Sequence, residues 1–391
     1  MISVVEAREI LASHLRRGAQ ASLNVADAAG LVVCRNICSP IDVPLFDNSA
    51  MDGYAIAFGS DRDRWNVVTE IPAGSSSAYS VKDGEAARIY TGSPIPEGTD
   101  TVIPQELTER DGNTVYLLSN RIEKAANVRY TGSQVKAGET VIKAGTMLTA
   151  GGVGLLSSMG LAAVPVYAPP IVSVIVTGNE LGEAGRPLKP GMIYNSNGPM
   201  LQAALLQSGI SLYHVSQSGD DEIRLTQLLK KELNRSDLVI ISGGISVGDY
   251  DFVKTCLARL EVNELFYQVK QRPGKPFYVG KAGEKWVFAL PGNPASVLTC
   301  FNQFVKPCLK FMMGHEDVWL PELVLPLAED YSKKAGLTFF MKAIREEGRV
   351  RVLGGQQSFN LAAFAHADCL VELSEEADFV AAGTPLNVFL L

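Results

Sequence analysis

The sequence predicts a multidomain α/β plus β protein, in which a central α/β domain with a mostly parallel sheet lies between two β-rich regions. The chain has 391 residues, which exceeds one ordinary domain and favours two to four. Apolar strands alternate with helices over residues 171–313, a spacing typical of a parallel sheet. On either side, short β-branched runs are separated by Gly, Pro, Asn and Asp, which predicts further β-rich domains.

The N-terminal elements are a helix followed by short strands. VVEAREILASHL (4–15) has apolar residues at helical spacing, so we expect an amphipathic helix that ends at Gly18. Runs such as GEAARIYTG and GNTVYLLS make residues 24–170 β-rich. TAGGVGLLSSMG (149–160) predicts that a helix returns near the end of this region.

The central region alternates strands and helices. The expected strands are IVSVIVTG, SLYHVSQSG, DLVIISGG and ELFYQVK, followed by a hairpin of KPFYVG and KWVFALPG. The expected helices are NGPMLQAALLQSG, DDEIRLTQLLKKEL, DFVKTCLARL and the long PASVLTCFNQFVKPCLKFM. Because ligands of such sheets bind beyond the carboxyl ends of the strands, VTGNEL, SQSGDD, SGGISVGD and LPGNPAS fall where a site is expected.

The C-terminal region, residues 317–391, returns to short strands and glycines. ELVLPLAED, RVRVLGG, CLVELSEE and PLNVFLL predict a small all-β domain, with a junction between Pro307 and Pro321.

Composition restricts the classes of function. Lys and Arg number 35 against 42 acids, a net charge of −7, so any anionic ligand requires a local basic cluster and nucleic acid is not expected. Neither a signal peptide nor an apolar run of membrane-spanning length is recognisable, which predicts a cytoplasmic enzyme without a membrane partner. The six cysteines form no CxxC pair and the four histidines are dispersed, so neither a zinc site nor a histidine-based triad is expected.

The loop SGGISVGDYDF (242–252) is the first candidate site. Ser242, Gly243 and Gly244 leave a buried strand and precede a helix expected to begin near Asp251. Glycine backbone N–H groups can approach an anion closely, and a helix N-terminus favours negative charge. The carboxylates of Asp249 and Asp251 oppose this. Two interpretations therefore remain open: the acids cap the helix, or they hold Mg²⁺. A solvated carboxylate describes Asp249 best.

Further acids occupy equivalent strand ends. Glu180 follows VTGN, and Asp220 and Asp221 follow SQSG. The sheet brings these ends together, and clustered carboxylates are costly unless a cation neutralises them. A divalent ion is the simplest hypothesis, and it predicts Mg²⁺-dependent activity that is lost when Asp251 becomes Asn.

Cations follow in QRPGKP (271–276), where Arg272 and Lys275 flank a Pro-Gly turn. An oxyanion site and an ordinary solvated turn are both compatible with this segment. Ser296, in LPGNPAS, could bind an oxyanion together with free N–H groups, or the segment could simply start a helix with proline. In the N-terminal half, Asp52 and Thr91 lie in stretches that are best interpreted as loops of a β-domain.

Seven segments occur in a fixed order between residues 47 and 296: DNSAMDGYAI, RIYTGSPIPEGTDTVIPQE, VTGNEL, IYNSNGPML, SGGISVGDYDF, RPGKPFYVG and LPGNPAS. Together they resemble the MoeA family of molybdopterin molybdenumtransferases, which includes the E domain of gephyrin. Each segment alone is a weak signal, whereas seven in order are highly specific.

The resemblance implies a homodimer of four-domain subunits with a shared active site. The implied domains are an elongated mixed dimerisation domain (1–40 and 130–168), an inserted β-rich domain (41–129), an α/β molybdopterin-binding domain (169–316) and a C-terminal β-barrel (317–391). The implied reaction inserts molybdate into adenylylated molybdopterin, with Mg²⁺, and releases AMP. Molybdopterin adenylyltransferase and molybdoenzymes are implied as partners.

The resemblance also implies a set of functional residues. The catalytic set is Asp52, Thr91, Glu180, Asp220 and Asp251, of which Asp220 and Asp251 hold the metal. Asp52 and Thr91 are expected to face the α/β domain of the partner subunit. The substrate-binding set is Ser242, Gly243, Gly244, Arg272, Lys275, Ser296, Lys342 (in FFMKAI) and Ser358 (in GGQQSF).

The chain departs from the family pattern at three cationic positions. Gln268 stands where lysine is frequent, Arg272 where lysine is common, and Lys342 where arginine is common. Since arginine binds an oxyanion through two parallel bonds and lysine acts as a point charge, these exchanges predict altered molybdate affinity. Lys270 is a candidate replacement for the missing charge, displaced by about 7 Å along a strand.

Two alternative functions remain. Adenylylation of molybdopterin needs only the α/β unit, and the additional domains and DNSAMDGYAI disfavour it. A gephyrin-like scaffold that binds a receptor peptide would need no cluster of acids.

Overall fold

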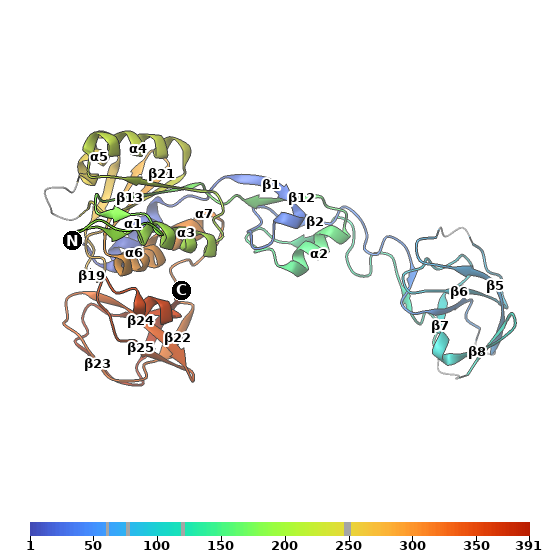
Figure 1. Cartoon of the computed structure of the whole chain (residues 1–391). Helices are drawn as coiled ribbons and strands as arrows, with labels where there is room; N and C mark the ends of the chain where they lie inside the picture. The colour runs from blue at the N-terminus through green and yellow to red at the C-terminus, as the bar shows by residue number, and fades with distance from the viewer. Residues whose placement is uncertain (60–61, 76–78, 119–121, 246–251) are drawn as a thin grey trace. The chain divides into compact units, whose positions relative to one another are not determined.

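A computed structural model describes residues 1–391 except 60–61, 76–78, 119–121 and 246–251 (Figure 1). The chain divides into two compact units. Unit 1 comprises Met1–Ser22, Gly30–Cys34 and Pro165–Leu391, and unit 2 comprises Leu23–Ala29 and Arg35–Val164. In the described part of the chain, no helix has both the length and the apolar character needed to cross a membrane.

Unit 1 contains the predicted α/β sheet, with six strands in the order β16-β13-β17-β21-β20-β18. Their bounds are β13 (Val172–Thr177), β16 (Tyr213–Ser218), β17 (Leu238–Ser242), β18 (Asn263–Tyr267), β20 (Tyr278–Ala282) and β21 (Lys285–Leu290). β13 pairs in parallel with β16 and β17, and β17 pairs in parallel with β21. The predicted hairpin is confirmed, because β20 is antiparallel to β21 and to β18. The carboxyl ends of β13, β16, β17 and β21 consequently meet at one edge.

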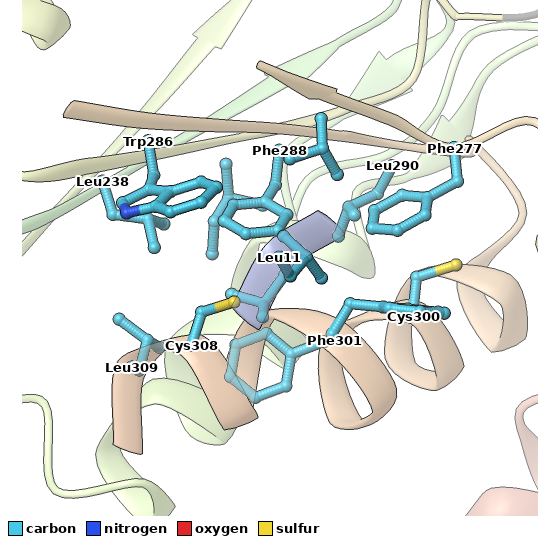
Figure 2. Close-up of a cluster of buried hydrophobic side chains, with 14 of the residues drawn as sticks. Leu11, Leu238, Phe277, Trp286, Phe288, Leu290, Cys300, Phe301, Cys308 and Leu309 are labelled. Atoms are coloured by element: carbon cyan, nitrogen blue, oxygen red, sulfur yellow. The ribbon is translucent and has the colours of Figure 1, made fainter. Parts of the chain in front are cut away.

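Helices cover the two faces of this sheet. They are α1 (Val4–His14), α3 (Asn197–Gln207), α4 (Glu222–Arg235), α5 (Val253–Arg259), α6 (Pro294–Cys300) and α7 (Lys306–Met312). On one face, an aromatic layer of Phe277, Trp286 and Phe288 packs on Phe301 and on Leu11 of α1 (Figure 2). On the other face, α4 and α5 bury leucines against Ile175 and Ile241. Two apolar faces explain why the central strands β13, β17 and β21 are almost continuously hydrophobic.

The predicted long helix is one continuous helical segment with a wide turn inside it. A π-helical stretch, η3 (Phe301–Val305), connects α6 to α7. Pro307 lies just beyond this stretch and has no backbone N–H, so the regular i→i−4 bond to Gln303 cannot form.

The N-terminal helix is amphipathic, as predicted, but the prediction that it ends at Gly18 was wrong. Ser3 and Glu6 form a capping box, while the helix stops at His14 and Leu15 is already extended. Gly18 has a different role: its N–H donates to the carbonyl oxygen of Met312 (2.8 Å), and a Cβ on Gly18 would lie 2.9 Å from that oxygen. Close packing against the end of α7 therefore explains this glycine.

The C-terminal part of unit 1 is β-rich. Its main sheet has the order β19-β24-β26-β28-β22, with β25 paired to β24. The bounds are β19 (Gln271–Arg272), β22 (Leu323–Pro326), β24 (Thr338–Glu346), β25 (Arg349–Val352), β26 (Cys369–Leu373) and β28 (Pro385–Leu390). A bridge between Leu327 and Val350 links the chain after β22 to β25, and the ring of strands closes there. The short β23 (Tyr331–Ser332) and β27 (Phe379–Val380) form a ribbon, and α8 (Ala362–His366) precedes β26.

Unit 2 has its own six-stranded sheet, in the order β7-β4-β6-β5-β9-β8. The bounds are β4 (Gly53–Ile56), β5 (Arg64–Ile71), β6 (Glu85–Ile89), β7 (Thr101–Pro104), β8 (Thr108–Asp111) and β9 (Thr114–Leu117). Short ribbons pair β2 (Ile37–Cys38) with β11 (Thr140–Ile142), and β3 (Asn48–Ser49) with β10 (Val128–Arg129). The predicted helix is confirmed as α2 (Ala150–Ser158), and Thr149 caps it. The division between the units falls within β1 (Gln20–Asn24) and β12 (Ala163–Tyr167).

Candidate functional site

A pocket of about 640 Å³ lies at the carboxyl edge of the α/β sheet. The ends of β13, β17 and β21 and the loops that follow them form its walls. The short parallel ribbon of β14 (Leu181–Gly182) and β15 (Ile193–Tyr194) forms a further wall. The predicted residues that line it are Glu180, Asp220, Ser242, Gly243 and Gly244. The expectation that the strand-end loops meet is therefore confirmed for these residues.

The two glycines after β17 are required by close packing. Gly243 has φ +97°, and a Cβ there would lie 2.7 Å from Thr177 Oγ1 and 2.9 Å from Thr177 O. The Gly243 N–H donates to the carbonyl oxygen of Leu290 (3.1 Å). That amide is thus used inside the protein and does not offer a free N–H to an anion in this arrangement. Bare glycine backbone forms a wall of the pocket instead.

Asp249 and Asp251 lie outside the described residues, as does all of 246–251. The described part of α5 begins at Val253, and no side chain caps it at Phe252. Whether Asp251 caps this helix or holds a metal stays a prediction.

Asn197 is a pocket residue that the sequence reasoning did not single out. Its Nδ2 donates to Ser242 Oγ (2.9 Å) and to the carbonyl oxygen of Gly292 (2.8 Å), so it connects the loops after β17 and β21. Its Oδ1 is buried without a hydrogen-bond partner in the described part of the chain. A buried acceptor without a partner is costly, and a donor group on a ligand would relieve that cost. An asparagine at the start of a Pro-containing helix, in NSNGP, was the available signal.

Two carboxylates line the pocket without cationic partners in the described part of the chain. Asp220 is held by reciprocal bonds: its Oδ2 accepts from the Asn179 N–H (3.3 Å), and its own N–H donates to Asn179 Oδ1 (3.1 Å). Among the described residues, neither Glu180 nor Asp220 forms an ion pair. Asp221 differs, because it caps α4 by accepting from the Arg224 N–H (2.9 Å).

The donor set of the pocket fits Mg²⁺. Within the described ranges, no three His, Cys, Asp or Glu side chains come together as a candidate metal-binding group. Mg²⁺ does not need such a cage, because it usually keeps several waters and binds one or two carboxylates together with substrate phosphates. Glu180 and Asp220 offer the hard oxygen atoms that this mode of binding uses.

A second pocket, of about 470 Å³, adjoins the first and is basic. It brings together four predicted oxyanion-binding residues, namely Arg272, Lys275, Ser296 and Ser358. The two pockets share walls formed by Pro276, Pro291, Asn293 and Phe359.

Arg272 reaches the basic pocket because its segment belongs to the C-terminal sheet. The short β19 pairs in parallel with β24, with Arg272 opposite Phe339, and the guanidinium lies 5.2 Å from the Phe339 ring centre. Neither Arg272 nor Lys275 forms an ion pair within the described residues. Both cations are exposed and available to an anion.

The start of α6 is attached to the C-terminal loop. The Ala295 N–H donates to the carbonyl oxygen of Ser358 (3.0 Å), and Asn293 Nδ2 donates to Ser358 Oγ (3.0 Å). The Ala295 amide is consequently not one of the free N–H groups that the sequence suggested for an oxyanion.

Lys342 does not line either pocket. Its side chain is buried (2% exposed), and its Nζ donates to the carbonyl oxygens of Gly355 (2.8 Å), Asn360 (3.2 Å) and Gln357 (3.3 Å). Burial lowers the pKa of this lysine. The expectation that Lys342 itself binds an oxyanion has no support in these contacts.

Lys270 does not replace the charge that is missing at Gln268. Its Nζ lies 2.8 Å from Glu375 Oε1, and this hydrogen bond, with the charge of Glu375, raises the pKa of Lys270. The ammonium is therefore neutralised locally.

Asp52 and Thr91 are neighbours within unit 2. Asp52 Oδ1 accepts from the Thr91 N–H (2.7 Å) and from Thr91 Oγ1 (2.9 Å). These bonds lower the pKa of Asp52 and keep it ionised. Asp52 is thus a carboxylate that Thr91 fixes within unit 2.

Comparison with known proteins covers the whole chain. The MoeA N-terminal region (domain I and II) matches residues 2–160, a probable molybdopterin binding domain matches 173–310, and the MoeA C-terminal region (domain IV) matches 324–391. Molybdopterin molybdenumtransferase 2 of Mycobacterium tuberculosis is 34% identical over 403 residues, covering 100% of this chain and 99% of the relative. The molybdopterin molybdenumtransferase of Haemophilus influenzae is 35% identical over 401 residues, covering 99% and 98%.

Solved structures agree with these matches. The molybdopterin biosynthesis MoeA protein of Pyrococcus horikoshii has a TM-score of 0.82 and 30% identity, with 100% of both chains covered. This similarity supports a multidomain MoeA architecture. The chain belongs to the MoeA family of molybdopterin molybdenumtransferases.

Proposed function

We propose that this chain is an enzyme that inserts molybdate into adenylylated molybdopterin, with Mg²⁺, and releases AMP. The observation that carries the proposal is the adjacency of two pockets of opposite character. The larger one has carboxylates without ion-pair partners among the described residues, and the basic one presents two exposed cations and two serines. Such a pair suits one substrate with a metal-bound phosphate linkage and a second that is an oxyanion.

The larger pocket is proposed to bind the pterin nucleotide. Glu180 and Asp220, together with Asp251, would hold Mg²⁺, which supplies positive charge to the phosphate groups of the substrate when bound. Asn197 offers a buried acceptor oxygen to a donor on the ligand. The backbone of Gly243 and Gly244 permits close approach of the substrate.

The basic pocket is proposed to bind molybdate. Arg272 can donate two parallel bonds to an oxyanion, Lys275 adds a point charge, and the hydroxyls of Ser296 and Ser358 add hydrogen bonds. Because the two pockets share walls, the oxyanion would lie beside the pterin nucleotide. Proximity of the two substrates is then the main contribution of the protein.

The family also suggests an organisation beyond one chain. We infer an elongated mixed dimerisation domain (1–40 and 130–168), an inserted β-rich domain (41–129), a molybdopterin-binding α/β domain (169–316) and a C-terminal β-barrel (317–391). The bridge between Leu327 and Val350 supports the barrel. A cytoplasmic homodimer in which Asp52 and Thr91 serve the site of the partner subunit completes the proposal.

The test is direct incubation of the purified protein with adenylylated molybdopterin, Mg²⁺ and molybdate. Formation of molybdenum cofactor with an equal amount of AMP supports the proposal. Consumption of ATP with unadenylylated molybdopterin would indicate an adenylyltransferase, and no reaction with either substrate would leave a scaffold.

Omission of Mg²⁺, followed by its restoration, tests the metal separately. Light scattering tests the dimer, and a fully active monomer would contradict the shared site.

A further inference from the structure

We propose that Lys342 is a positioning residue: it holds the loop 355–360, and through that loop Ser358 and Phe359, at the wall between the two pockets. The identities of the two substrates rest on the proposed function. The hydrogen bonds between Lys342 and the loop are observed in the structure and do not depend on that function.

The hydrogen bonds of Lys342 are matched to the loop. An ammonium group has three N–H donors, and three carbonyl oxygens of the loop accept from Nζ. The Lys342 main chain binds the same loop, because its N–H donates to Gln356 Oε1 (3.1 Å) and its carbonyl oxygen accepts from Gln356 Nε2 (2.8 Å). One residue of β24 therefore anchors the loop through its side chain and its backbone.

The anchored loop presents two different groups to the pockets. Ser358 lines the basic pocket, and its Oγ is bonded to Asn293 at the start of α6. Phe359 lines both pockets, although 67% of its surface is exposed. An aromatic ring exposed on a pocket wall gains by stacking on a planar ring. The ligand class that fits Phe359 is thus a planar heterocycle, which in the proposed reaction belongs to the pterin nucleotide.

Lys342 cannot hold the loop and bind an anion at the same time. Its three donors are already committed to carbonyl oxygens, and an anion would have to displace at least one of them. Both pockets should consequently depend on Lys342, because Phe359 belongs to both. A direct anion ligand would affect the oxyanion alone.

The main experiment compares Lys342→Met with Lys306→Met. Lys306 is a matched control, because its Nζ also donates to a backbone carbonyl, that of Leu390 (3.0 Å), but it lines neither pocket. We expect Lys342→Met to raise KM for molybdate and for adenylylated molybdopterin about tenfold each, with a much smaller change in kcat. Lys306→Met should leave both KM values unchanged. A rise confined to molybdate would overturn the positioning role.

Hydrogen exchange separates this inference from the proposed function, since it needs no substrate. Amides of residues 355–360 should exchange faster in Lys342→Met and at the normal rate in Lys306→Met. Unchanged exchange in Lys342→Met would overturn the proposal even in an active enzyme. If the wild-type chain inserts no molybdate, the proposed function fails while this measurement still reports on Lys342.

Two further variants guard against misfolding and against a ligand role. Phe359→Ala alters an exposed side chain, so the fold should persist, and it should raise KM for the pterin nucleotide. If its effect simply adds to that of Lys342→Met in the double variant, Lys342 does not act through Phe359. Lys342→Arg retains the charge, but a planar guanidinium cannot place three donors at one point, so the KM values should remain raised. A normal or lowered molybdate KM in Lys342→Arg would indicate direct anion binding.

Discussion

Carboxylates at the amino-terminal and carboxyl edges of the α/β sheet differ in whether the protein supplies them with a cationic partner. Near the amino-terminal edge, Glu232 is fully buried and accepts from Arg235 (2.7 and 2.8 Å) and Ser173 (2.6 Å). At the carboxyl edge, Glu180 and Asp220 face a pocket and have no cationic partner among the described residues. One end supplies stability with its charges compensated internally. The other leaves charges for a ligand or a metal to compensate.

The pKa of Glu232 shows how complete this internal compensation is. Burial alone would raise the pKa of the carboxyl group, but the hydrogen bonds from Ser173 and Arg235, with the charge of Arg235, outweigh it and lower the pKa. Ser236 extends the network, because its hydroxyl lies 2.6 Å from that of Ser173. A buried charge of this kind persists only when it is fully hydrogen-bonded.

The largest expected effect is a loss of activity in Asp220→Asn, at the carboxyl edge of the sheet. The substitution removes the negative charge that would hold Mg²⁺, while an amide oxygen can still accept from the Asn179 N–H. We expect AMP release to fall about 100-fold or more, the size of effect seen when one electrostatic group is removed from an active site. Thermal stability should not change measurably.

Asp221→Asn is the matched control for that substitution. Asp221 is the neighbouring residue and caps α4, and asparagine caps a helix as well as aspartate does. Its activity should therefore stay near that of the wild type. Equal losses in the two variants would show that the charge at position 220 has no special role.

The second-largest effect is a loss of stability, expected at the amino-terminal edge of the sheet. Glu232→Ala leaves the Ser173 hydroxyl and the partly exposed Arg235 without their acceptor, and should lower the free energy of unfolding by about 2 kcal/mol. Urea unfolding measures this change, and kcat under stabilising conditions should be retained. The pair of Lys281 and the exposed Glu284 supplies the control, because Glu284→Gln should cost less than about 0.5 kcal/mol. If Glu232→Ala lost activity but not stability, Glu232 would serve function and not stability, and the two edges of the sheet would no longer differ.

Much of this arrangement was predictable because it depends on local patterns. Continuous apolar runs identified the strands β13 and β17, and the rule for parallel sheets placed Glu180 and Asp220 at the same edge. These inferences need only the period of the sequence and the position of a residue after its strand.

The basic pocket was harder to predict because its geometry depends on distant pairing. The strand β19 has only two residues and pairs with Thr338 and Phe339, so no periodicity revealed it. In β24, residues 338–343 are all buried, and the usual alternation of inward and outward residues is missing. The direction of the Lys342 side chain could not be inferred without that alternation, so its hydrogen bonds to the carbonyl oxygens of residues 355, 357 and 360 were not predicted.

A smaller effect is expected from Arg272→Lys in the basic pocket. Lysine retains the positive charge but loses the two parallel donors, so KM for molybdate should rise about fivefold. The KM for the pterin nucleotide should be unaffected, because Arg272 lines the basic pocket and not the larger one. Steady-state kinetics with each substrate varied in turn measures both constants. A change in the pterin KM alone would reverse the assignment of the two pockets.

The smallest expected effect is a pH dependence of the unfolding free energy, which arises from Glu232 at the amino-terminal edge of the sheet. The folded state lowers the pKa of Glu232 from its ordinary value of 4.5, so this carboxylate contributes stability above that pH and loses it as the pH falls through the folded-state pKa. Glu232→Gln removes the titrating group. The difference in unfolding free energy between the wild type and Glu232→Gln should therefore be constant near neutral pH and shrink below about pH 4.5. Urea titrations at successive pH values measure it, and a difference that grew on acidification would mean that burial, not the bonds from Ser173 and Arg235, dominates at Glu232.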